Sequence, residues 1–142
     1  MSRSFDGVDD NIDMGDVLDF TAPPISLAIW CYALGTGEAG FGRFFEKYSG
    51  TTGYRFLIET STTITFWNDT GENTSSALFS LNTWQHVCVT YDGSNVRFYI
   101  NGSPAGVIAQ LGGLTEHTSA LQIGNRPAGD RTFDGLLAEA AI

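Results

Sequence analysis

The sequence predicts an all-β protein, built as a two-sheet antiparallel sandwich, and two observations lead to this fold class. Apolar and polar residues alternate with a period of two, which is typical of strands that cover one side of a core. Turn residues recur at short intervals along the chain, which contains 17 glycines among 142 residues. No stretch repeats apolar residues at helical spacing, so we expect any helix to be a single turn.

Nothing in the sequence divides the chain. It has no internal repeat, charge block or Pro/Ser-rich linker, so residues 1–142 are predicted to form a single domain. A chain of this length can bury a core without disulfide bonds or a structural metal.

The segment from Leu27 to Tyr32 is apolar on both faces and predicts a central strand covered on both sides. Trp30 lies in the middle of this segment. We therefore expect its ring to be buried between the two sheets.

The next alternating segments fix which side chains point outward. In residues 54–59 the apolar side chains at every second position face the core, and Arg55 points away from it. In the strand that follows, Ile64 and Phe66 form the core pair. Trp67 is then expected to point outward.

The strongest structural signal lies between Trp84 and Gly106. Asp92-Gly93 and Asn101-Gly102 each separate two alternating segments, and these dipeptides favour tight hairpin turns. The segment therefore predicts three consecutive antiparallel strands.

This segment also resembles a known family. W-x-H-V-x-V-T-Y-D-G, which starts at Trp84, and V-x-F-Y-I-N-G, which starts at Val96, are similar to the signature of laminin-G-like, concanavalin A-like jelly rolls. Further matches follow the order of the family's strands: residues 4–12, 26–31, 121–125 and 133–139. The resemblance covers nearly the whole chain and implies a concanavalin A-like jelly-roll β-sandwich.

The resemblance also implies candidate metal ligands, because many members of the family hold calcium near the termini or on a loop. The candidates are Asp6, Asp9, Asp10 and Asp134. The family has an acidic residue where this chain has Ala138, so we expect calcium to bind weakly or not at all and no cofactor to be required. The alternative is that these aspartates are turn residues bonded to their own backbone.

Catalysis is not indicated. Glycoside hydrolases of this fold carry two carboxylates on one strand in an E-x-D-x-x-E run, whereas the glutamates here stand apart, although distant pairs can still meet in space. No nucleophile motif adjoins His86 or His117, and no glycine-rich phosphate loop is present. We predict that the protein is not an enzyme.

Charge and composition exclude several partners. The net charge is −9, so the surface repels nucleic acid and anionic lipid. No segment has the length of a transmembrane helix, and the first ten residues given lack the apolar stretch that is typical of a signal peptide. Cys31 and Cys88 are expected to be reduced, with pairing left open if their strands face each other.

Five outward-facing residues are the candidate ligand-binding set: Arg55, Trp67, His86, Arg97 and Tyr99. Aromatic rings beside planar hydrogen-bonding groups suit the faces and edges of sugars. We expect Trp67 to anchor the ligand, flanked by the others where their strands are neighbours. An ordinary sheet surface is the alternative, and the loops at residues 48–54 and 68–73 are a second candidate site.

The sequence therefore predicts a non-catalytic recognition or adhesion module that binds a glycan or a protein partner and is displayed on an extracellular or particle surface. The alternative is a structural or decoration subunit of a virion or other surface assembly, as a homo-oligomer or part of a larger complex. Observing a symmetric assembly would favour this second hypothesis.

Overall fold

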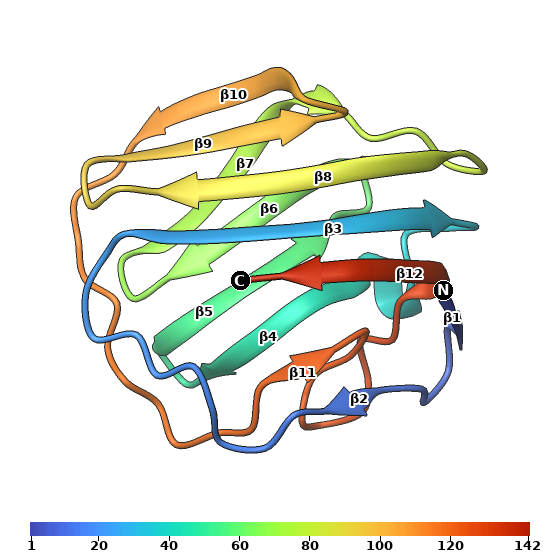
Figure 1. The fold of residues 1–142 in the computed structure, drawn as a ribbon, viewed down its shortest axis with the longest axis horizontal. Helices are drawn as coiled ribbons and strands as arrows, with labels where there is room; N and C mark the ends of the chain where they lie inside the picture. The colour runs from blue at the N-terminus through green and yellow to red at the C-terminus, as the bar shows by residue number, and fades with distance from the viewer.

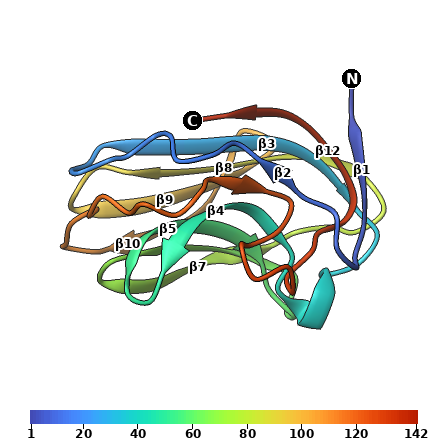
Figure 2. The ribbon, with the colours of Figure 1, turned by 90° about the horizontal axis from the view of Figure 1, so that it is seen from below.

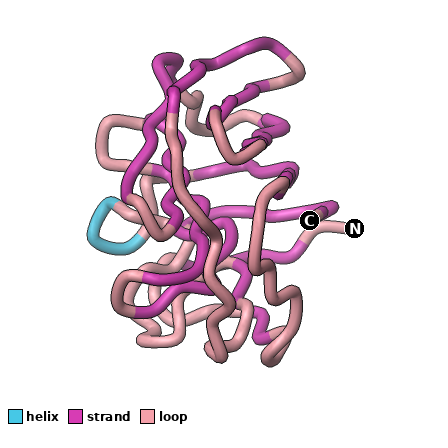
Figure 3. The backbone as a smooth tube through the Cα atoms, turned by 90° about the vertical axis from the view of Figure 1, so that its left-hand side faces the viewer, coloured by secondary structure: helices cyan, strands magenta, loops and turns pink.

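The computed structural model describes all 142 residues and shows two six-stranded antiparallel sheets packed face to face (Figure 1). The two layers are seen from the edge in Figure 2. Figure 3 shows that strands make up most of the regular structure; the one helical element is the 3-10 turn η1 (Glu38–Gly40). The predicted two-sheet β-sandwich is confirmed.

Sheet A holds the strands nearest the viewer in Figure 1. In spatial order they are β1 (Arg3–Asp6), β12 (Asp134–Ala141), β3 (Ile25–Ala33), β8 (Trp84–Tyr91), β9 (Asn95–Ile100) and β10 (Ser103–Ala109). Sheet B lies behind it. Its order is β2 (Ile12–Asp13), β11 (Gln122–Ile123), β4 (Arg43–Ser49), β5 (Thr52–Ile58), β6 (Thr63–Asn68) and β7 (Gly71–Leu78). The structure contains no helix that would cross a lipid bilayer.

The core lies between the sheets and contains 24 buried residues. Ile64 and Phe66 of β6 belong to it, as the alternation predicts, and so do Tyr54, Phe56 and Ile58 of β5. Each sheet therefore has one apolar face on the core and one face turned away from it.

The hairpins β8–β9 and β9–β10 are confirmed. Asn101 and Gly102 both have positive φ, 52° and 77°, as a type I′ turn requires. The Asn101 side chain also accepts a hydrogen bond of 2.9 Å from the backbone N–H of His86, which fixes the turn against β8.

The expectation that Trp30 is buried is wrong. Strand β3 is central in sheet A, but its outer face has no layer over it, and Trp30 is 38% exposed. The ring lies 5.4 Å from the ring of His86, its partner on β8. Strand β3 is apolar on both faces, but only its inner face packs on a core. Its outer face is covered by aromatic pairs with the neighbouring strand.

The two cysteines lie on adjacent strands but point to opposite faces of sheet A. Cys31 is buried in the core, where its thiol donates to the carbonyl oxygen of Gln85 at 3.4 Å. Cys88 is partly exposed and faces outward beside Ala28 and Tyr99. Both are free thiols in this structure.

Candidate functional site

The outer face of sheet B is hollowed into a groove. Side chains that turn away from the core here are nonetheless buried, among them Arg43, Glu46, Leu57 and Thr65. Two open cavities of about 320 and 390 Å³ lie on this face, and Arg55 lines both. We call the two together the sheet-B groove.

The two cavities differ in charge. The smaller one, which we call the arginine half, is lined by Glu46, Tyr48, Ser49, Gly50, Arg55, Ser119, Arg126, Pro127 and Ala128. The larger one, the glutamate half, is lined by Phe41, Arg43, Arg55, Leu57, Glu59, Trp67 and Glu72.

A β-bulge in β4 forms the base of the groove. The pairing of β4 with β5 shifts register between Arg43 and Phe45, and both Phe44 and Phe45 are buried in the core. The bulge therefore places Arg43 and Glu46, three residues apart, on the same outer face.

Arg43 and Glu46 form a buried ion pair. Arg43 donates from Nε to Glu46 Oε2 and from Nη1 to the carbonyl oxygen of Phe41 at 2.8 Å, and both residues are only 3% exposed. Burial lowers the pKa of Arg43, and Glu46 offsets part of that effect. A pair buried this deeply fixes the shape of the groove base.

Arg55 occupies the centre of the groove, where its guanidinium contacts two aromatic rings. Its guanidinium carbon lies 4.0 Å from the centre of the Trp67 ring and 4.6 Å from that of Tyr48, and the two rings are 6.4 Å apart. The register explains the arrangement, because Arg55 pairs with Trp67 on β6 and with Glu46 on β4. Cation–π contacts with these two rings, which meet edge to face, hold the guanidinium in place.

Burial lowers the pKa of Arg55, and the Nε atom is buried without a hydrogen-bond acceptor. No carboxylate forms an ion pair with this residue. The arginine at the centre of the groove is thus held by two rings and by the more distant charges of Glu46 and Glu72, without an ion pair.

Glu59 and Glu72 line the glutamate half together. Burial raises the pKa of Glu59, and the charge of Glu72 raises it further. Two carboxylates that stand apart in the sequence therefore meet in one cavity, an arrangement that the spacing of the glutamates left open.

The rim of the arginine half carries further charges. Arg126 is paired with Asp130, with Nη2 2.7 Å from Oδ2, and Arg131 lies 3.6 Å from the same carboxylate. The guanidinium of Arg131 also lies over the ring of Phe41 at 5.7 Å.

The structure divides the five predicted ligand residues between two opposite faces. Arg55 and Trp67 are neighbours in the sheet-B groove, and Trp67 points outward as predicted, half-buried beneath Arg55. His86, Arg97 and Tyr99 lie on β8 and β9, on the outer face of sheet A. Because β9 and β6 belong to different sheets, Arg97 and Tyr99 do not flank Trp67.

The outer face of sheet A carries an aromatic strip formed by Trp30, Tyr32, Trp84 and His86. The rings of Tyr32 and Trp84 lie 6.0 Å apart, and they are the next pair on the same face of the sheet after Trp30 and His86. None of these four residues lines a cavity, and the strip lacks the buried charged groups that line the sheet-B groove.

The predicted loop site merges with the groove. Tyr48, Ser49 and Gly50, at the turn between β4 and β5, line the arginine half. Asp69 in the second loop accepts a hydrogen bond of 2.9 Å from the backbone N–H of Gly53 and ties the two loops together. The loop at residues 48–54 therefore forms one end of the groove, and the loop at residues 68–73 lies against it and contributes Glu72 to the glutamate half.

The candidate metal ligands form a turn. Asp6 lies opposite Asp134 across β1 and β12, and its Oδ1 accepts from the backbone N–H groups of Val8 and Asp9. Asp10 accepts from the backbone N–H of Asp6 at 3.0 Å. No group of three or more metal-ligating side chains is assembled in the structure. The contacts favour the turn role, and calcium binding remains a prediction.

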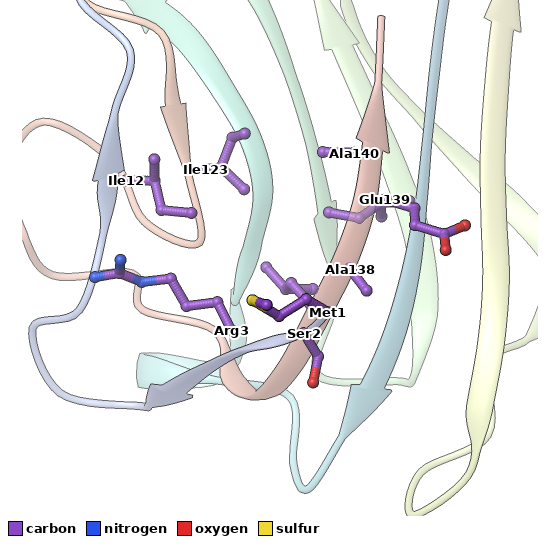
Figure 4. Close-up of a pocket in the computed structure, with 10 residues that line it drawn as sticks. Met1, Ser2, Arg3, Ile12, Ile123, Ala138, Glu139 and Ala140 are labelled. Atoms are coloured by element: carbon purple, nitrogen blue, oxygen red, sulfur yellow. The ribbon is translucent and has the colours of Figure 1, made fainter.

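A third cavity of about 290 Å³ lies near the termini (Figure 4). Seven of its ten lining residues are hydrophobic, including Ile12 and Ile123. Figure 4 shows the charged ends of Arg3 and Glu139 on opposite sides of the cavity. Without converging polar groups, this cavity suits a sugar less well than the sheet-B groove does.

Comparison with known proteins gives one family. The family model described as the concanavalin A-like lectin/glucanases superfamily matches residues 6–142. No curated protein matches the chain.

Solved structures with the same fold include three from different organisms. Domain 4 of the extracellular arabinanase AbnA from Geobacillus stearothermophilus, in complex with arabinotriose, has a TM-score of 0.74 at 16% identity, over 98% of this chain and 68% of the other. Domains LG4-5 of the mouse laminin alpha1 chain have a TM-score of 0.69 at 12% identity, over 98% and 40%. A Ruminococcus gnavus sialidase carbohydrate-binding module, bound to α2,3-sialyllactose, has a TM-score of 0.62 at 9% identity, over 96% and 88%.

Proposed function

The chain belongs to the concanavalin A-like lectin/glucanases superfamily, and from this premise we propose that it is a non-catalytic carbohydrate-binding module, displayed on an extracellular or particle surface, that binds its ligand in the sheet-B groove. Its partner is a glycan, and the half-buried ring of Trp67 is the anchor.

One observation carries the proposal. The centre of the groove combines two aromatic rings, Tyr48 and Trp67, with polar side chains that buried contacts hold in place. Sugars are recognised by such a combination, because the C–H-rich ring face packs on an aromatic surface while fixed polar groups bond to the hydroxyls. Two proteins of the same fold are found in complex with arabinotriose and with sialyllactose, which supports the ligand class.

A glycan array tests this proposal. The wild-type protein is expected to retain at least one oligosaccharide, and Trp67→Ala to lose it while keeping the β-sheet circular dichroism spectrum of the wild type. Trp84→Ala is the matched control, because Trp84 is an exposed tryptophan on the opposite face of the molecule. Equal loss in both variants, or no retained glycan with the wild type, would reject the sheet-B groove.

A hydrolase would need two carboxyl groups at a set separation, and Glu59 and Glu72 are the pair that the groove offers. The proposal expects the retained oligosaccharide to stay intact when incubated with the protein across pH 4–8. Release of new reducing ends by the wild type, abolished by Glu59→Gln, would replace the binding function with hydrolysis.

The second candidate function is a structural or decoration subunit, and the aromatic strip on sheet A favours it. Trp30 and Trp84 are 38% and 41% exposed there, and exposed rings in a row are favoured anchors for a neighbouring protein. Light scattering on the wild type and on Trp84→Ala separates the two candidates. A symmetric assembly that Trp84→Ala dissociates would support the subunit.

A further inference from the structure

We infer that the sheet-B groove recognises an acidic glycan, and that a carboxylate of this glycan binds at Arg55. The inference rests on the proposed function. It adds the charge of the ligand and names the residue that recognises this charge.

The pairing of the cations is the first step. The protein carries 16 acidic residues against seven lysines and arginines, so most cations have a carboxylate beside them. The pairs are Arg43–Glu46, Lys47–Asp16, Lys47–Asp19, Arg97–Asp92, Arg126–Asp130 and Arg131–Asp130. Only Arg3 and Arg55 have none. Arg3 is exposed beside the N-terminus, whereas Arg55 is half-buried in the groove.

The environment of Arg55 is the second step. A charged group that leaves water loses hydration, and an acidic partner normally compensates for this. At Arg55 the two rings supply part of the compensation, and the nearby charges of Glu46 and Glu72 supply another part without forming an ion pair. The Nε atom has no acceptor. An arginine guanidinium held in a fixed plane is preorganised for a carboxylate, which accepts two parallel hydrogen bonds from such a group.

The charge of the surrounding groove is the third step. In the arginine half, Arg55 and Arg126 are the cationic residues, and Glu46 is the acidic one, already paired with Arg43. The glutamate half carries Glu59 and Glu72 beside Arg55 and the paired Arg43, so its acidic residues are not outnumbered by cations. An acidic sugar therefore fits with its carboxylate at the arginine half, while a neutral sugar unit offers hydroxyl donors to the glutamate carboxylates.

The test compares matched acidic and neutral ligands. Trigalacturonate is titrated by calorimetry beside its methyl ester, and α2,3-sialyllactose beside lactose. The acidic member of at least one pair is expected to bind roughly tenfold or more tightly than its neutral partner, with an affinity that falls as salt is raised. These two pairs also distinguish a uronic acid from a sialic acid.

Three variants test whether Arg55 is responsible for the preference for acidic over neutral ligands. Arg55→Gln is expected to bring the acidic ligand down to the affinity of its neutral partner. Arg55→Lys, which keeps the charge without the planar fork, is expected to retain part of the difference. Arg97→Gln, on the opposite face, is expected to behave as the wild type. Thermal melting shows whether each variant is folded. If Arg55→Gln does not fold, the affinity difference between acidic and neutral ligands is measured with Arg55→Lys.

The outcomes are distinct. Equal binding of acidic and neutral ligands, or discrimination that survives Arg55→Gln, overturns the inference and leaves the glycan-binding function standing. No binding of any glycan on the array or in solution overturns both.

Discussion

The indole ring of Trp30 lies against the imidazole ring of His86 on the outer face of sheet A, with 5.4 Å between the ring centroids. Tyr32 and Trp84 repeat the arrangement one rung along the same two strands, at 6.0 Å. The centre of sheet A is therefore stabilised on its solvent side by cross-strand aromatic pairs, and on its other side by the core.

Replacing Trp30 by Ala is expected to cost about 1 kcal/mol of unfolding free energy, because the change removes a cross-strand pair and leaves no internal cavity. Phe66→Ala, which empties a fully buried site, is expected to cost about 3–5 kcal/mol. Urea denaturation of both variants measures the difference. A Trp30→Ala loss as large as that of Phe66→Ala would contradict the exposed position of the ring.

Glu46→Gln is expected to destabilise the fold by about 3 kcal/mol, since it leaves the Arg43 charge buried without its partner. The double variant Arg43→Met/Glu46→Leu removes both charges and is expected to recover most of the loss. Chemical denaturation of the single and double variants gives the comparison. Equal stability of Glu46→Gln and the wild type would show that the pair is hydrated.

Asp92 is expected to titrate near pH 2. The hydrogen bond from Arg97, together with backbone N–H groups of Asn95 and Ser94, lowers the pKa of this carboxyl from 3.8 to about 2. The folded pKa lies below the unfolded one, so this group adds stability above pH 3.8, and that stability is lost as the pH falls toward 2. NMR titration of the carboxyl carbon measures the value, and Arg97→Gln is expected to raise it.

Calcium is expected to bind weakly or not at all. The oxygens of Asp6 and Asp10 already accept backbone N–H groups, and Ala138 supplies no ligand. Calcium prefers six to eight oxygens. Calorimetry after chelation and dialysis should show no micromolar binding isotherm, and a tight isotherm that returns each time calcium is restored would be the contrary result.

Alternation in the sequence predicts which side chains enter the core. The inward positions of Phe66, Tyr54 and Phe98 follow from it, as do the hairpins at Asp92 and Asn101. Trp30 was misplaced because a strand with apolar residues on both faces gives no parity signal. Its solvent side can be recognised only when the neighbouring layers are known.

The candidate site was predictable only in part. Alternation places Arg55, Trp67, His86, Arg97 and Tyr99 outside the core, but it cannot say to which sheet a strand belongs. The pairing of strands into sheets depends on contacts between distant residues, and it separated this set into two faces. The bulge at Phe44 and Phe45 interrupts the period of two in β4. For this reason alternation does not predict that Arg43 and Glu46 both face outward at the base of the groove.

Cys31 and Cys88 point to opposite faces of sheet A, so one of the two thiols can be labelled selectively. Cys31 is enclosed in the core, so a maleimide reagent reaches Cys88 alone in the folded state. Burial raises the pKa of the Cys88 thiol, which makes a mildly alkaline buffer the better medium for the reaction. A fluorophore, or a sensor surface to which the protein is coupled, is then attached on sheet A. The sheet-B groove on the opposite face stays accessible to ligand, and no engineered tag is needed.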